Sequence, residues 1–314
     1  MRMLRIGVQS KNVVYDENPA DGFKLLNEIG FECCDFSLNK YLLNSDLYEE
    51  RRNSFFEKST NELKTFFKPH KDGADKYGIT INQMHMPYPM YVPKAKEEFN
   101  AFLWENVGIK SLEICHFLNC HNIVVHGIKL QAICGSEEKE WEKTKELFKF
   151  LAPKAKELDI TMCMENLYNP LGAHMEEGPG CNVYKAVERI DEINEEYGAE
   201  ILGFCYDTGH GNLVGLDSYK FITKLGKRLK VLHMHENDGI ADLHQLPFTF
   251  TRTRDNVSVL DWEGVIKGLR DINFDGVLSF ETAPVLDCFP KELKEDVLRL
   301  IFATGKYFAE QVCK

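Results

Sequence analysis

The chain has 314 residues, 44% hydrophobic and 28% charged, which is enough to build one large core or two modest ones. Its formal net charge of −11 argues against nucleic acid as a partner, because nucleic-acid-binding proteins usually carry a basic face. No apolar run approaches the roughly 20 residues that a membrane-spanning helix needs. We therefore expect neither a membrane nor a nucleic-acid partner.

The N-terminal segment MRMLRIGVQS runs into a strand pattern and lacks the apolar segment and cleavage site of a signal peptide. The ten cysteines are sparse for a chain of this length, and none forms a CxxC pair. Several of them lie inside apolar runs, where a thiol packs as a small hydrophobic group. We expect reduced thiols and a cytoplasmic protein.

Short apolar runs alternate with segments of helical period along the whole chain, the pattern of repeated β-α units. Eight strands are expected, at residues 4–10, 31–39, 79–88, 121–127, 160–167, 201–210, 229–237 and 277–282. The chain lacks the glycine-rich phosphate fingerprint of an open doubly wound sheet after its first strand. The pattern predicts an α/β fold, a (β/α)8 TIM barrel formed by one domain over residues 1–314.

The connections between these strands differ in length. Glycines able to adopt positive φ are expected to end the helices before four of the strands, at Gly30, Gly78, Gly198 and Gly276. Residues 40–76 exceed what a simple connection needs and predict an extra helix or a lid. The long connections 168–180 and 238–261 both follow strands, so they should lie over the face at which the strands end.

Four side chains able to bind a divalent metal end four successive predicted strands: Glu165, Asp207, His235 and Glu281. A single acid at a strand end is often only a helix cap or a solvated charge. In a parallel barrel, however, all these strand ends lie on one face. Three carboxylates and an imidazole suit Mn²⁺, which we expect first, or Zn²⁺, Co²⁺ or Mg²⁺, rather than a metal selected by thiolates.

Alternation along the strands fixes which residues share the barrel interior. If Glu165 and Asp207 point inward, Cys163 and Cys205 do too, whereas Met162, Met164, Phe204, Tyr206 and Phe280 point outward under the helices. His233 lies two residues, roughly 6.6 Å, deeper than His235. We therefore expect His235 to bind the metal and His233 to be a buried, hydrogen-bonded histidine beside the site.

Further polar residues surround the same face. His85 and His126 end earlier strands, and His210 follows Asp207 by three residues. Asp242 and His244 form an i, i+2 pair that can be either a metal site or a structured loop. These five residues are expected to contact substrate or a second metal, and Arg252 or Arg254 to hold the far end of the substrate.

The segments MENLYN, DTGHGN, HMHENDGIADLH, SFET, HMPY and VVHG together resemble the xylose-isomerase-like barrel superfamily over nearly the whole chain. In its epimerase branch, the resemblance implies that Glu165, Asp207, His235 and Glu281 hold one divalent metal. It also implies that the two glutamates exchange a substrate proton and that His210 contacts the sugar. LPFTFTRTRDN stands where sugar-acting members often have PGEG, so the substrate pocket should be individual here.

The resemblance also includes endonucleases of the type that cut DNA at abasic sites. That branch adds ligands matching His85, His126, His210, Asp242 and His244 and binds three zinc ions. The short loop from His235 to Asp242 and the acidic charge argue against it. We expect a metal-dependent isomerase or epimerase of a sugar or polyol, which can form a homo-oligomer. A three-zinc phosphodiesterase and a non-catalytic sugar-binding barrel are the alternatives.

Overall fold

A computed structural model describes residues 3–130, 136–251 and 259–314. Eight parallel strands lie in the order β10-β1-β2-β3-β4-β5-β8-β9. Their bounds are Arg5–Gln9 (β1), Cys33–Ser37 (β2), Thr80–His85 (β3), Asn122–Val125 (β4), Thr161–Glu165 (β5), Leu202–Asp207 (β8), Leu229–His233 (β9) and Val277–Phe280 (β10). Met234 closes the ring between β9 and β10: its N–H donates to the Ser279 oxygen (2.8 Å), and its oxygen accepts from Glu281 N (3.2 Å). The predicted TIM barrel is confirmed.

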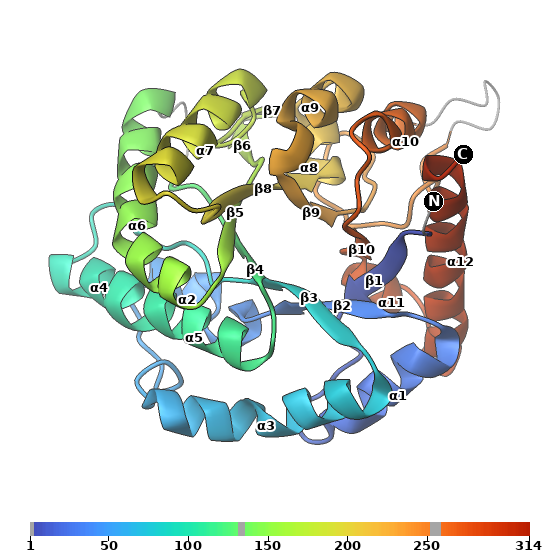
Figure 1. Ribbon diagram of the computed structural model, residues 1–314, viewed down its shortest axis with the longest axis horizontal. Coiled ribbons are helices and arrows are strands. Elements are labelled where there is room, and N and C mark those ends of the chain that lie inside the picture. The colour runs from blue at the N-terminus through green and yellow to red at the C-terminus, as the bar shows by residue number, and fades with distance from the viewer. Residues whose placement is uncertain (1–2, 131–135, 252–258) are drawn as a thin grey trace.

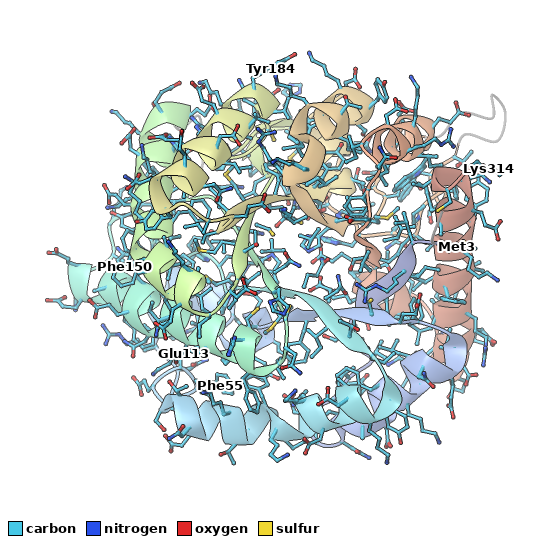
Figure 2. The ribbon with its side chains drawn as sticks, in the orientation of Figure 1. Met3, Phe55, Glu113, Phe150, Tyr184 and Lys314 are labelled. Atoms are coloured by element: carbon cyan, nitrogen blue, oxygen red, sulfur yellow. The ribbon has the colours of Figure 1, made fainter. Side chains whose placement is uncertain are left out.

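Helices surround the barrel on its outside (Figure 1). The main ones, one after each barrel strand, are α1 (Pro19–Ile29), α3 (Thr60–Tyr77), α5 (Ile109–Phe117), α6 (Glu137–Glu157), α7 (Val183–Tyr197), α9 (Ser218–Leu225), α10 (Trp262–Asp271) and α12 (Lys294–Val312). Shorter helices are α2 (Asn44–Tyr48), α4 (Glu97–Phe102), α8 (Thr208–Leu213) and α11 (Ala283–Asp287). Figure 2 shows Met3 beside α12, on the same side of the molecule as Lys314, which follows that helix.

The inward and outward faces of the strands separate as alternation predicts. Val124, Cys163, Cys205 and Val231 form a small apolar cluster of their own inside the barrel. The outward residues, including Met162, Met164, Phe204, Tyr206 and Phe280, belong to the large core between strands and helices. The predicted register is confirmed, and it directs Glu165 and Asp207, two residues beyond the two cysteines, into the mouth of the barrel.

Helix ends agree with the sequence at three of the four predicted glycines. Gly30, Gly78 and Gly198 follow their helices with φ of 116°, 65° and 60°. The prediction for Gly276 is wrong, because Asn273 takes the left-handed conformation after α10, with φ of 53°. The short polar side chain of asparagine tolerates this region, so the chain turns before it reaches the glycine.

The long connections contain structure of their own. Residues 40–76 hold the expected extra helix, α2, before α3 begins. The connection after β5 forms an antiparallel hairpin of β6 (Tyr168–Leu171) and β7 (His174–Glu177), which the sequence did not predict. No helix in the described ranges is long and apolar enough to cross a membrane. All nine cysteines in those ranges are free thiols.

Candidate metal centre and pocket

The predicted metal-binding side chains lie at the carboxyl ends of their strands. Glu165 and Asp207 are the last residues of β5 and β8, and Glu281 follows β10 directly. Asn166 fixes the first two ends together: its Nδ2 donates to the Asp207 oxygen (2.9 Å), and its Oδ1 accepts from Asp207 N (2.8 Å). The fold therefore brings three carboxylates from separate strands to one rim.

A compact donor cluster forms at this rim from Glu165, Asp207, Glu281 and His233, whose ligand atoms all lie within 4.8 Å of one another. His233 Nδ1 is 2.9 Å from Glu165 Oε1, 3.2 Å from Glu281 Oε2 and 3.8 Å from an Asp207 oxygen. Glu165 Oε2 is buried and lies 2.9 Å from His126 Nε2. Converging carboxylates and imidazoles are donors that fit a divalent ion.

Both histidines of the HMH segment point into the site. His235 Nε2 lies 3.0 Å from Asp207, and its buried Nδ1 has no hydrogen-bond partner among the described residues. His233 is fully buried, as expected, and contacts two of the carboxylates directly. The strand register explains the difference in height: His233 pairs with Asp207, whereas Met234 pairs with Phe280, so His235 lies level with Glu281.

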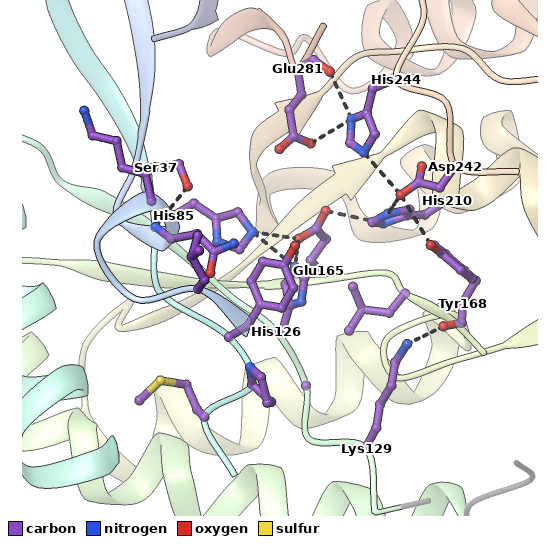
Figure 3. Close-up of a pocket in the computed structure, with 18 of the residues that line it drawn as sticks. Ser37, His85, His126, Lys129, Glu165, Tyr168, His210, Asp242, His244 and Glu281 are labelled. Carbon is purple, nitrogen blue, oxygen red and sulfur yellow. Dashed lines mark hydrogen bonds and ion pairs between the residues drawn. The ribbon is translucent and has the colours of Figure 1, made fainter. Parts of the chain in front are cut away.

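Two further groups flank the central cluster (Figure 3). His85 and His126 meet Glu165, with His126 Nε2 2.9 Å from Glu165 Oε2 and the two imidazoles 3.1 Å apart. On the other side, Asp242 Oδ2 lies 3.1 Å from His244 Nε2 and 3.4 Å from His210 Nε2. His85, His126 and Glu165 form one potential ligand group, and His210, His235, Asp242 and His244 form another.

The loop after β9 is folded so that Asp242 and His244 reach the centre. Glu236 and Gln245 pair through two backbone hydrogen bonds of 2.7 and 2.8 Å. His244 takes a left-handed φ of 47°, stacks on His235 at 4.0 Å and lies 3.0 Å from the Glu281 backbone oxygen through its Nδ1. The structured loop expected from the sequence therefore also forms part of the site.

One glycine makes this packing possible. A Cβ built on Gly209, in α8, would lie 2.0 Å from the His235 ring. Thr208 Oγ1 holds the same segment by donating to the His235 oxygen (2.7 Å), and it lies 3.0 Å from His235 N. The glycine of DTGHGN therefore provides the space in which the imidazole lies.

The ionisable groups of the site shift one another's pKa values strongly. Burial would raise the pKa of Glu165, but the charges of His233 and His126 and their hydrogen bonds hold it well below its usual range. Burial lowers the pKa of His126 to about 4. Burial likewise opposes the charged forms of His210 and His244, but the acids around them raise the pKa of His210 to about 10 and that of His244 to about 9. A bound cation would replace the protons that these histidines otherwise hold.

The donor groups open into a cavity of about 390 Å³, within the size range of small-molecule sites. His85, His126, His210, Asp242 and His244 all line it, as predicted from the sequence. Arg252 and Arg254, the predicted contacts for the far end of a substrate, lie outside the described residues.

Sequence reasoning missed several residues of the cavity. Gln9 Nε2 donates to Glu281 Oε1 (2.8 Å) and so orients a carboxylate from across the barrel. Tyr88 packs on the His126 ring at 4.1 Å, and Lys129 lines the wall near Tyr168. A strand-end position was a signal for Gln9, but no local pattern marked the other residues.

Known proteins resemble this chain in sequence over a part and in structure over almost all of its length. The uncharacterized protein y4fM of Sinorhizobium fredii (strain NBRC 101917 / NGR234) is 32% identical over 113 residues, 32% of this chain and 34% of that protein. The match thus spans about a third of the length of this curated relative.

Two solved structures share the fold. D-psicose 3-epimerase, solved in the presence of D-fructose, has a TM-score of 0.66 at 15% identity, over 98% of this chain and 99% of that one. The IOLI protein with a zinc atom has a TM-score of 0.63 at 15% identity, over 98% of each chain.

The family profile described as xylose isomerase-like TIM barrel matches residues 23–300. That range includes seven of the eight barrel strands, all of the flanking donor groups and the whole central cluster. The chain therefore belongs to the xylose isomerase-like TIM barrel family.

Proposed function

We propose that this protein is a divalent-metal-dependent isomerase or epimerase that moves a proton on a sugar or polyol. The observation that carries this proposal is the convergence of Glu165 and Glu281 on one point at the inner end of the cavity, 2.9 and 3.2 Å from the same nitrogen of His233. Two structures of the same fold support this proposal: the epimerase solved in the presence of D-fructose and the IOLI protein with its zinc atom.

Glu165, Asp207, His235 and Glu281 would hold the ion, and Mn²⁺ is the ion we propose first, with Zn²⁺, Co²⁺ and Mg²⁺ as alternatives. When bound, the ion supplies Lewis-acid polarisation of substrate oxygens, which acidifies the neighbouring C–H bond. His233 would hold the Glu165 and Glu281 carboxylates in place through its Nδ1, as imidazoles beside metal sites commonly do.

The two glutamates would carry out the proton transfer. One carboxylate takes the proton from the substrate carbon, leaving an enediolate, and a carboxylic acid returns a proton to the same or the adjacent carbon. Gln9 keeps Glu281 oriented during this exchange through its 2.8 Å hydrogen bond. His210, which lines the cavity beside Glu165 at 3.4 Å, would steady a substrate oxygen.

The proposal is tested by turnover in D₂O with a panel of ketoses and aldoses and with Mn²⁺, Co²⁺ or Mg²⁺ added. Wild-type protein should place deuterium on the reacting carbon of one of these sugars. Glu281→Gln should keep the fold while turnover falls by about 10² to 10⁴, the range for losing an acid–base group. Turnover with full retention of carbon-bound hydrogen would indicate a hydride shift instead.

The two flanking groups favour a second candidate, a phosphodiesterase with three zinc ions. His85 and His126 with Glu165, and His210 with Asp242 and His244, provide the donors that two additional ions would need. About three tightly held zinc ions per chain, with cleavage of an abasic duplex that weakens steeply with salt, would establish this activity. About one ion per chain and no cleavage would support the isomerase.

Sugar binding with no turnover under any of these conditions would instead identify a non-catalytic barrel. We further propose a cytoplasmic location, from the free thiols and the N-terminal pattern, and the lack of a nucleic-acid partner, from the acidic charge. The proposal also allows a homo-oligomer.

A further inference from the structure

The charges along the cavity wall are divided sharply. Among the residues that the structure describes, every acid that lines it belongs to the donor groups described above: Glu165, Asp242 and Glu281. Away from these donors, the charged residues of the described lining are three lysines, Lys11, Lys40 and Lys129. The part of the cavity that does not serve the metal is therefore cationic, in a chain whose net charge is −11.

Only one of these lysines has a carboxylate partner among the described residues. Lys40 Nζ lies 2.7 Å from Asp16 and also sits over the Tyr41 ring at 4.8 Å. Asp16 does not line the cavity, so the charge of Lys40 is neutralised from behind. Neither Lys11, which is exposed, nor Lys129, which is partly buried, forms an ion pair within 4.0 Å in the described ranges.

Of the two lysines that form no ion pair in the described ranges, Lys129 is the better candidate for binding an anion. Its ammonium donates to the backbone oxygen of Tyr168 and lies 5.3 Å from the Tyr168 ring centre (Figure 3). A carbonyl satisfies one of three N–H donors and carries no net charge. Burial lowers the pKa of this ammonium against the opposing influence of Glu140 and other acids. A partly buried cation with this environment gains when an anion binds beside it.

Tyr168 lies between Lys129 and the donor groups of the cavity. Its hydroxyl is 3.4 Å from Asp242 Oδ2, and its ring is 5.2 Å from that of His210. A substrate whose hydroxyls face the donor groups would thus reach Lys129 across a single tyrosine. We propose that the substrate carries an anionic group, a carboxylate or a phosphate ester, and that Lys129 binds it; this rests on the sugar-directed function proposed above.

The test uses three matched polyols: glucitol, gluconate and glucitol 6-phosphate. Their binding to metal-loaded and metal-free protein is measured by calorimetry at low and at raised salt. Wild type should bind at least one of the two anions about tenfold or more tightly than glucitol, the usual worth of a charge-assisted hydrogen bond. The preference should shrink as salt rises, because dissolved ions partly screen a charge that solvent can still reach.

The variants Lys129→Met and Lys129→Gln should abolish this preference while leaving glucitol binding unchanged. Lys306→Met, which changes an exposed lysine of α12 outside the cavity lining, is the matched control and should retain it. Gluconate alone being favoured would identify a sugar acid, and glucitol 6-phosphate alone a phosphorylated sugar.

Two results would overturn the proposal: equal binding of all three polyols, or an anion preference that persists in both Lys129 variants. The second result would place the anion on the metal or on Lys11. Because these readouts need no turnover, they separate this proposal from the isomerase. If deuterium exchange is absent but the preference for an anion depends on Lys129, only the proposed reaction is rejected. If deuterium exchange occurs but no such preference is found, only the anionic subsite is rejected.

Discussion

The two halves of the barrel contribute opposite kinds of side chain to one cavity. Among the described residues, strands β5, β8, β9 and β10 and the loops after them supply every acid of the lining, together with buried Asp207. Strands β1 to β4 and their loops supply amide, hydroxyl, imidazole and lysine groups. The carboxylates proposed to hold a metal and the lysine proposed to bind an anionic group therefore lie on different walls, so substitutions of these residues in the two halves should have separable effects.

The largest effect is expected from Glu165→Gln, because Glu165 belongs both to the central cluster and to the His85–His126 group. The variant should lose most of its metal, and turnover should fall by about 10² to 10⁴. Metal content by mass spectrometry and circular dichroism are the measurements. His126→Gln, on the other wall, should keep the central ion. Equal metal loss in both variants would break the division between the halves.

The next prediction compares His233, the last residue of β9, with His235, two residues beyond it. His235→Ala should release the ion, since its unpartnered Nδ1 and its contact with Asp207 suit a ligand. His233→Gln should weaken metal binding by only about 10- to 100-fold, as expected for a group that orients ligands. Competition with a fluorescent chelator gives both affinities. The reverse order would make His233 the ligand.

Gly209→Ala should act through packing, because its Cβ would enter the space of the His235 ring. We expect a loss of about 1–3 kcal/mol in the free energy of unfolding, as for other overpacked sites, together with weaker metal binding. Gly172→Ala is the control: its Cβ would meet no atom of the described residues within 4 Å, although its φ of 61° strains an alanine. That variant should lose stability in urea without any change in metal affinity.

The mildest perturbation is a change of pH on the metal-free protein. His210 and His244 have pKa values raised to about 10 and about 9 by nearby acids, despite burial. A raised pKa in the folded state stabilises it fully below the unfolded value of about 6.5. This stabilisation should therefore disappear between about pH 6.5 and 10, measured by urea unfolding across that range. Bound metal should flatten the dependence, because the positive charge of a nearby ion lowers the pKa values of these imidazoles.

Most of the fold could be predicted from local patterns. The eight strands and their inward and outward faces follow from apolar spacing that each segment carries by itself. The extra helix α2 was expected from the length of residues 40–76. The hairpin β6–β7 was missed because its residues show no apolar alternation: Asn169 pairs with Glu176 and Tyr168 with Glu177, and the buried side chain of β6 is the polar Asn169. The end of α10 was misplaced because Asn273 competes with Gly276 for the same turn.

The sequence by itself determined that acids and histidines end the later strands, and hence that they meet on one rim, because parallel strands in a barrel point their carboxyl ends the same way. Only the tertiary structure decided how far along the barrel axis each of these side chains lies. The stagger between neighbouring strands is a property of the closed ring, and it sets His233 level with Asp207 and His235 level with Glu281. It also decided that Lys129 faces the cavity beside Tyr168, since contacts between distant loops leave no periodic mark in either segment.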